Sequence, residues 1–185
     1  MQEGQIVHQF EVNDGSITFR YPRWSDLDAF IKMHQTLAEE KVMARRLKLN
    51  RDTGGRMLAE ALIGLQENRA SYLLVEQASD LVGEGFLTRG GHGYFTVGLA
   101  LLERARGLGI GTQLMNTLER EACRLGAKRL YLTVWSANLV AIHVYQKVGY
   151  QECGRRPDWI QMDSGEACDL IEMVKNPIDA NLSIS

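Results

Sequence analysis

Apolar residues recur along the chain in two rhythms, and each rhythm predicts a different element. Alternating or continuous apolar runs of six to nine residues predict β-strands at 16–21, 71–77, 81–89, 94–102 and 128–134. Turn-forming residues separate the middle three, so an antiparallel meander is expected there. The last two strands are expected at 150–153 and 166–175, joined by a loop that contains Arg155, Arg156, Pro157 and Trp159.

Apolar residues spaced three and four apart predict the helices. The first has the apolar face Leu27, Phe30, Ile31 and Leu37, with Ser25 or Asp26 as its cap. The charged stretch 38–50 is expected to form a turn and a short helix. The next helix, capped by Asp52 or Thr53, carries Met57, Leu58, Ala61, Leu62 and Leu65. A third follows residues 110–125 and a fourth residues 138–148, ended by Gly149.

The order of these elements predicts an α/β fold. A strand, two helices, a three-stranded meander, a helix, a strand, a helix and a hairpin describe a mixed, mostly antiparallel sheet of about seven strands, flanked by four or five helices. We expect residues 16–175 to form the domain. Residues 1–15 are an extension, either flexible or paired at a sheet edge, and residues 176–185 form a tail.

Composition and charge narrow the class of protein. The chain of 185 residues is 45% hydrophobic and 24% charged, with a formal net charge of −2, which argues against nucleic acid as its main partner. It has no apolar run long enough for a bilayer and no signal-peptide pattern, so neither a membrane nor secretion is expected. Cys123, Cys153 and Cys168 are odd in number and far apart, which predicts reduced thiols, no metal site and a cytoplasmic location.

The stretch from Val97 to Gly111 carries the main chemical signal. A buried strand leads through Gly107, Gly109 and Gly111 into the third helix. Such a turn directs free backbone N–H groups outward at the positive end of the helix, which makes an anion site, above all for phosphate. A nucleotide P-loop would need a lysine that this turn lacks, and neither glycine start completes the G-x-G-x-x-G dinucleotide pattern.

The remaining pattern, R-x-x-G-x-G from Arg106 to Gly111, resembles the acetyl-CoA loop of the GNAT superfamily of N-acetyltransferases. A second pattern of that superfamily, N-x-x-A-x-x-x-Y-x-x-x-G-[FY], is matched at every fixed position from Asn138 to Tyr150. The resemblance covers roughly residues 16–175 and is specific only in the second half. It departs at Glu103 and Arg104, where many members have a proline before the loop.

The resemblance implies acetyl-CoA as the co-substrate, with a splayed parallel strand pair at its site. The expected diphosphate cradle is the loop of Gly107, Leu108, Gly109, Ile110, Gly111 and Thr112. The backbone of Leu99, Ala100 and Leu101 is expected to pair with the pantetheine arm. Arg106 either contacts phosphate or packs beside the loop. Asn138 contacts the arm, caps its helix, or does both.

The resemblance also implies that Tyr145 is the general acid that protonates the departing thiolate. The sequence does not identify the general base as clearly. Glu84 is the first candidate, and His92 and Tyr94 are the next. The alternative is a relay of ordered water in place of a single base. His143 is expected at the surface. A cationic acceptor suits Glu39, Glu40, Trp159 and Asp163, which lie in the segments expected to form the acceptor surface.

The activity expected from these features is transfer of the acetyl group to a primary amine by direct attack in a ternary complex. The acceptor is a small molecule, a protein N-terminus or a lysine. The alternative is a non-catalytic module that binds acyl-CoA or regulates in response to it. A homodimer is compatible with the sequence, which leaves the oligomeric state open.

Overall fold

The computed structural model describes residues 2–13, 15–40, 49–162 and 165–176. One sheet of eight strands contains β1 (Ile6–Val12), β2 (Gly15–Arg20), β3 (Ala70–Gln77), β4 (Asp80–Arg89), β5 (Tyr94–Leu101), β6 (Arg129–Trp135), β7 (Gln151–Gln161) and β8 (Ala167–Lys175). The α-helices in this part of the chain are α1 (Leu27–Glu39), α2 (Arg51–Gln66), α3 (Ile110–Arg124) and α4 (Leu139–Lys147). None of these helices combines the length and hydropathy that crossing a membrane requires.

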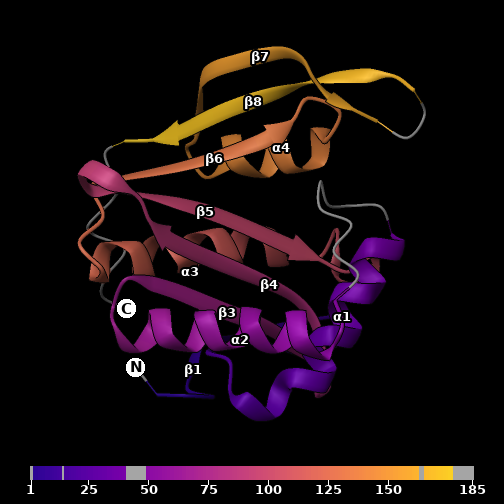
Figure 1. Cartoon of the computed structure of the whole chain (residues 1–185), viewed down its shortest axis with the longest axis vertical. Helices are drawn as coiled ribbons and strands as arrows, with labels where there is room; N and C mark the ends of the chain where they lie inside the picture. The colour runs from indigo at the N-terminus through magenta and orange to yellow at the C-terminus, as the bar shows by residue number, and fades with distance from the viewer. Residues whose placement is uncertain (1, 14, 41–48, 163–164, 177–185) are drawn as a thin grey trace.

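The strand order confirms the predicted mixed, mostly antiparallel sheet. The order is β1-β2-β3-β4-β5-β6-β8-β7, and only β5 and β6 run parallel (Figure 1). The sheet has eight strands rather than about seven. The additional strand is β1, whose residues 6–12 pair with β2 at the sheet edge. Its side chains are exposed or only half-buried, so its hydrophobic pattern is weak.

Strands β5 and β6 separate soon after they begin. Their pairing runs from Tyr94 opposite Arg129 to Thr96 opposite Tyr131 and then stops. Beyond this point β5 stays paired with β4 on its other side, as far as Leu101. The two parallel strands therefore form a fork that opens toward their carboxyl ends, as Figure 1 shows.

Helices cover both faces of the sheet. Figure 1 shows α2 in front of it, with α3 and α4 behind. Along β3, Leu73 and Val75 pack into the core on the α3 side, whereas Tyr72 and Leu74 pack against the α1–α2 side. Because successive side chains of a strand point to opposite faces, burial on both sides explains the continuous apolar run of this strand.

The structure corrects three local predictions. Asn50, and not Asp52 or Thr53, caps α2 by accepting a hydrogen bond from the Thr53 amide at 2.9 Å. Asp26 precedes α1 but does not cap it with its side chain, because its carboxylate binds the buried guanidinium of Arg20 instead. The turn and short helix predicted at 38–50 fall largely on residues 41–48, which lie outside the described residues.

The third correction concerns the predicted loop of Arg155, Arg156, Pro157 and Trp159. These residues belong to β7, which runs without interruption from Gln151 to Gln161. A bulge between Arg156 and Ile160 absorbs the proline, and Asp158 adopts a left-handed conformation there (φ 51°). Because β7 is an edge strand, Pro157 and the bulge are tolerated there.

Candidate active site at the strand fork

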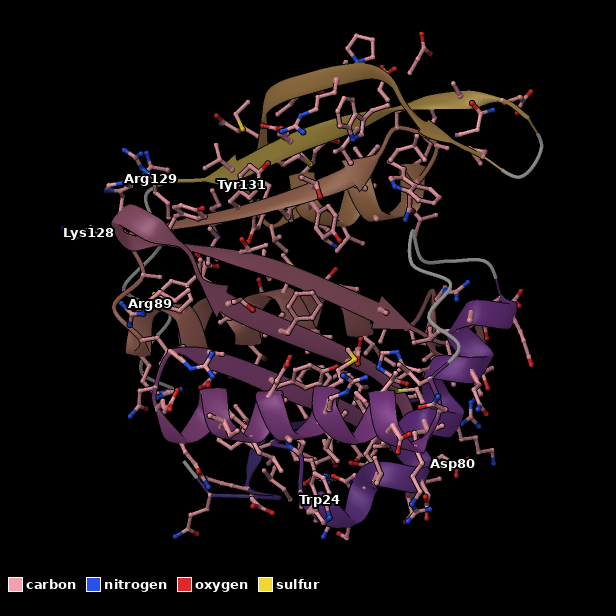
Figure 2. All side chains as sticks on the ribbon, viewed as in Figure 1. Trp24, Asp80, Arg89, Lys128, Arg129 and Tyr131 are labelled. Carbon is pink, nitrogen blue, oxygen red and sulfur yellow. The ribbon has the colours of Figure 1, made fainter. Side chains whose placement is uncertain are left out.

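A cavity of about 570 Å³ lies in the fork between β5 and β6. Its walls come from α1, α2, β4, β5, β6, α4 with its N-cap, and the β7–β8 hairpin. In Figure 2, Tyr131 marks the last residue of β6 that pairs with β5, and Lys128 and Arg129 lie at the closed end. The lining residues are His34, Ala38, Met57, Glu84, Phe86, Thr96, Val97, Gly98, Leu99, Thr133, Val134, Trp135, Asn138, Tyr145, Ile160 and Leu170.

The glycine loop presents free amides where α3 begins. In the described part of the chain, no hydrogen bond is donated by the backbone N–H groups of residues 107–112. The first amide satisfied within the helix is that of Gln113, which donates to the Gly109 carbonyl at 3.2 Å. Six consecutive unpaired donors at a helix N-terminus form the environment that a diphosphate requires.

Two glycines shape this loop. Gly107 and Gly109 have φ values of 75° and 76°, a conformation that side chains rarely adopt. A Cβ added at either glycine would meet no atom within 4 Å. The space beside these backbone segments is therefore open, so an anion can approach the loop amides closely.

The side chain of Arg106 is engaged with protein groups. Its guanidinium donates two hydrogen bonds to the Leu101 carbonyl, at 2.9 and 2.8 Å, and pairs with the carboxylate of Glu40. Glu40 also accepts a hydrogen bond from the Glu103 amide at 2.9 Å. Of the two roles left open for Arg106, this geometry favours support of the loop over direct contact with phosphate.

The β5 edge facing the fork has backbone groups available for a ligand. Leu99 is half-buried and lines the cavity, whereas Ala100 and Leu101 are buried. The Leu101 carbonyl is already taken by Arg106, which leaves the segment from Val97 to Ala100 as the part of this edge open to strand-like pairing.

Two residues of the second sequence pattern meet at the cavity. Asn138 caps α4 by accepting a hydrogen bond from the Ala141 amide at 3.1 Å, which leaves its NH₂ group free for the cavity. Tyr145 is buried, with its ring 6.0 Å from that of Tyr150. Its hydroxyl has no hydrogen-bond partner among the described residues, and burial raises the pKa of Tyr145 to about 12.

Glu84, from β4, also lines the cavity and is held by two side chains that the sequence did not reveal. The Nε2 atom of His34 lies 2.9 Å from Oε2 of Glu84, and the Tyr72 hydroxyl donates to the same oxygen. Burial, followed by the charge of Glu84, raises the pKa of Tyr72 well above its ordinary value, so this phenol remains a donor. The signal for His34 was its place among the apolar residues of α1, four after Phe30 and three before Leu37.

The other predicted candidates lie away from the cavity lining. His92 and Tyr94 are exposed near the start of β5, and His143 is exposed on α4. Glu39 is exposed, and Trp159 lies under the guanidinium of Arg156, 5.3 Å from the ring centroid. Asp163 lies outside the described residues. Within the described ranges, no group of three or more His, Cys, Asp or Glu residues could hold a metal ion.

Sequence comparison finds relatives that are named as N-acetyltransferases. YdgE, an uncharacterized N-acetyltransferase of Bacillus subtilis (strain 168), is 41% identical over 56 residues, which cover 30% of this chain and only 36% of that protein. Thialysine N-epsilon-acetyltransferase of Mus musculus is 25% identical over 167 residues, 82% of this chain and 95% of that protein.

A solved structure shares the fold. The structure of yncA, a putative acetyltransferase from Salmonella typhimurium with its cofactor acetyl-CoA, superposes with a TM-score of 0.74 at 18% sequence identity. The superposition covers 86% of this chain and 93% of the yncA chain. The model of the acetyltransferase (GNAT) family matches residues 31–150, more than half of the sequence. The chain therefore belongs to the acetyltransferase (GNAT) family.

Proposed function

We propose that the protein is an acetyl-CoA-dependent N-acetyltransferase that transfers the acetyl group to a primary amine. The observation that carries this proposal is that Tyr145 and Glu84, from α4 and β4, line the same cavity at the strand fork. One can donate a proton and the other can accept one. The relatives are named as N-acetyltransferases, which supports the reaction class, and the name of the mouse relative specifies an ε-amine acceptor.

Binding of the co-substrate would use polar groups that have no hydrogen-bond partner among the residues that the structure describes. The amides of residues 107–112 would hold the diphosphate, helped by the dipole of α3. The open edge of β5 from Val97 to Ala100 would hydrogen-bond the pantetheine amides in the manner of an added strand. The NH₂ group of Asn138 would donate to the same arm while its oxygen caps α4.

The reaction would divide between Glu84 and Tyr145. A primary amine is protonated at neutral pH, so Glu84 would first accept a proton from the ammonium group, and the neutral nitrogen would then attack the thioester carbonyl carbon. The C–N bond forms, the C–S bond breaks, and Tyr145 would donate its proton to the departing thiolate. The nitrogen would then lose its second proton to the Tyr145 oxygen by way of solvent, and Glu84 would release its proton to solvent, which restores both side chains.

The high pKa of Tyr145 is compatible with this role. A phenol whose pKa is about 12 stays protonated throughout the physiological range. Burial disfavours any charged form, so a thiolate released beside Tyr145 becomes more basic for the same reason. Burial therefore raises both the pKa of the Tyr145 phenol and the pKa of the thiol that forms. The difference between the two pKa values stays small, which keeps proton donation feasible.

The test is release of free coenzyme A thiol from acetyl-CoA with a panel of small amines, N-terminal peptides and lysine peptides. We expect turnover with at least one acceptor, and a loss of on the order of a hundredfold in kcat for Tyr145→Phe and for Glu84→Gln. The matched control is His143→Gln, an exposed change on the same helix as Tyr145. Tight acetyl-CoA binding without turnover for any amine would instead indicate an acyl-CoA-binding module.

A further inference from the structure

His34, Glu84 and Tyr72 form a buried hydrogen-bonded group at the cavity, which His34 and Glu84 line. Their exposed fractions are 4%, 1% and 7%. His34 comes from α1, Tyr72 from β3 and Glu84 from β4, so three elements meet at one carboxylate. A buried carboxylate is costly unless it is hydrogen-bonded, and these two partners supply the bonds.

The chemistry of the carboxylate fixes the direction of both bonds. The proposed base is an ionised carboxylate, which only accepts, so in that state Nε2 of His34 carries the proton that bridges the 2.9 Å to Oε2. The Tyr72 hydroxyl donates to this oxygen as well. Both donors thus converge on Oε2, whereas Oε1 has no hydrogen bond to any residue that the structure describes.

The imidazole of His34 is itself held in place. Its ring packs against Phe30 with 4.5 Å between centroids and an interplanar angle of 63°, an edge-on arrangement. Phe30 is fully buried and belongs to the core cluster under α1. Rotation of the His34 ring would break this contact together with the bond to Glu84.

We propose that His34 is a positioning residue: its Nε2–H donates to Oε2 of Glu84 and, with Tyr72, turns Oε1 toward the acceptor amine. This inference rests on the proposed function, because the oriented oxygen is the one that would receive the proton of the amine. His34 acts through Glu84 and does not touch the transferred group. Misplacing a reacting atom by about 1 Å is enough to lower a rate on the order of a hundredfold.

Two nearly isosteric substitutions separate hydrogen bonding from packing. Glutamine at position 34 carries an N–H donor near the place of Nε2, whereas methionine has the same length and no donor. We expect His34→Gln to keep kcat within about threefold of the unchanged protein and His34→Met to lower kcat about tenfold to a hundredfold. The KM for acetyl-CoA should be unchanged in both, because the diphosphate loop lies elsewhere.

Tyr72→Phe tests the same carboxylate from the other side. It removes the second donor to Oε2 and keeps the ring that stacks near Phe86. We expect a smaller loss in kcat than for His34→Met, and a double variant whose loss differs from the product of the two single losses, because both act on one group. Thermal unfolding of every variant controls for damage to the fold.

A spectroscopic measurement makes the inference independent of turnover. In ¹⁵N-histidine-labelled protein, the Nε2–H resonance of His34, assigned by its absence in His34→Gln, should be visible and slow to exchange with water. It should be lost to exchange in Glu84→Ala and unaffected in Tyr145→Phe. If no amine is acetylated, the proposed function fails, and this spectrum still decides whether the His34–Glu84 hydrogen bond exists.

The results that overturn the inference are equally specific. A folded His34→Met protein with an unchanged kcat would show that Glu84 needs no such support. Equal losses in the glutamine and methionine variants would show that the N–H donor is not what matters. An Nε2–H signal that is absent from the unchanged protein, or that is the same in Glu84→Ala, would exclude the hydrogen bond itself.

Discussion

Arg106 and Glu40 join the glycine loop to the end of α1. The guanidinium of Arg106 pairs with the carboxylate of Glu40, a residue 66 positions earlier, while it also donates to the Leu101 carbonyl. The Arg106 side chain is about one third exposed and that of Glu40 less. Through this pair, the carboxyl end of β5, the loop and the end of α1 are held together.

We therefore expect Arg106→Ala to weaken coenzyme A binding indirectly, by loosening the loop. Glu40→Gln leaves the arginine in place and removes its charged partner, so it should weaken binding in the same direction by a smaller factor. Arg106→Lys should not restore affinity, because an ammonium group cannot bridge the carbonyl and the carboxylate as a planar guanidinium does. Calorimetric titration with coenzyme A measures all three variants. Normal affinity in Glu40→Gln beside a large loss in Arg106→Ala would point to direct phosphate contact instead.

The raised pKa of Tyr145 makes the stability of the protein depend on alkaline pH. In the unfolded chain the phenol ionises near its ordinary value of 10.0, whereas in the folded protein it does so at about 12. The protonated phenol of Tyr145 contributes to the free energy of unfolding. This contribution is complete below pH 10 and is lost as the pH rises toward 12, because the unfolded state then releases the proton first. Two pKa units correspond to roughly 2–3 kcal/mol.

Tyr145→Phe should remove this part of the alkaline instability. We expect the free energy of unfolding, measured by urea titration between pH 9 and 12, to fall by about 2–3 kcal/mol less in the variant than in the unchanged protein. Because burial and not surface charge causes the shift, the difference should persist at 1 M salt. Parallel pH curves for the two proteins would contradict the assignment.

Gly109 and Gly111 provide a matched pair of positions in the glycine loop. Gly109 has a φ of 76°, so Gly109→Ala should lower the free energy of unfolding by about 1–2 kcal/mol through backbone strain alone. Gly111 lies within α3, where an added Cβ would meet its nearest neighbour, a Leu101 methyl carbon, at an ordinary 3.7 Å. Gly111→Ala should leave stability unchanged or raise it slightly. Denaturant unfolding of both variants checks this, and equal destabilisation would argue against the loop geometry.

Local patterns predicted most of the fold because most of its elements carry a strong local signal. The apolar run of β3 and the helical spacing of α3 each report burial of their own residues. The glycines predicted the loop because this signal is local as well. A positive φ concerns a single residue, and glycine is the residue that adopts it readily. Residues 6–12 lacked such a signal, because an edge strand with half-exposed side chains buries too little to impose an apolar rhythm.

The contacts inside the site could not be predicted in this way. Tyr72 and Glu84 are 12 positions apart, and His34 and Glu84 are 50 apart, so only the assembled sheet and helix bring them together. The partner of Arg106 is 66 positions away for the same reason. Pro157 suggested a loop, since a proline usually interrupts a ladder, but its position in an edge strand lets β7 continue through a bulge.

Substitutions can separate the capping role of Asn138 from its proposed binding role, because each uses a different atom. Its oxygen caps α4 through the Ala141 amide, and its NH₂ group is the proposed donor to the pantetheine arm. Asn138→Asp keeps the capping oxygen and adds a charge that suits a helix N-terminus, but it removes the donor. Asn138→Ala removes both the capping oxygen and the donor and should lower the free energy of unfolding by about 1 kcal/mol.

We expect both variants to bind acetyl-CoA several-fold more weakly, whereas only the alanine variant should unfold at a lower temperature. Titration calorimetry and thermal denaturation measure the two effects separately. Unchanged affinity in a stable Asn138→Asp protein would restrict the residue to its capping role, because the lost donor would then have had no partner in the co-substrate.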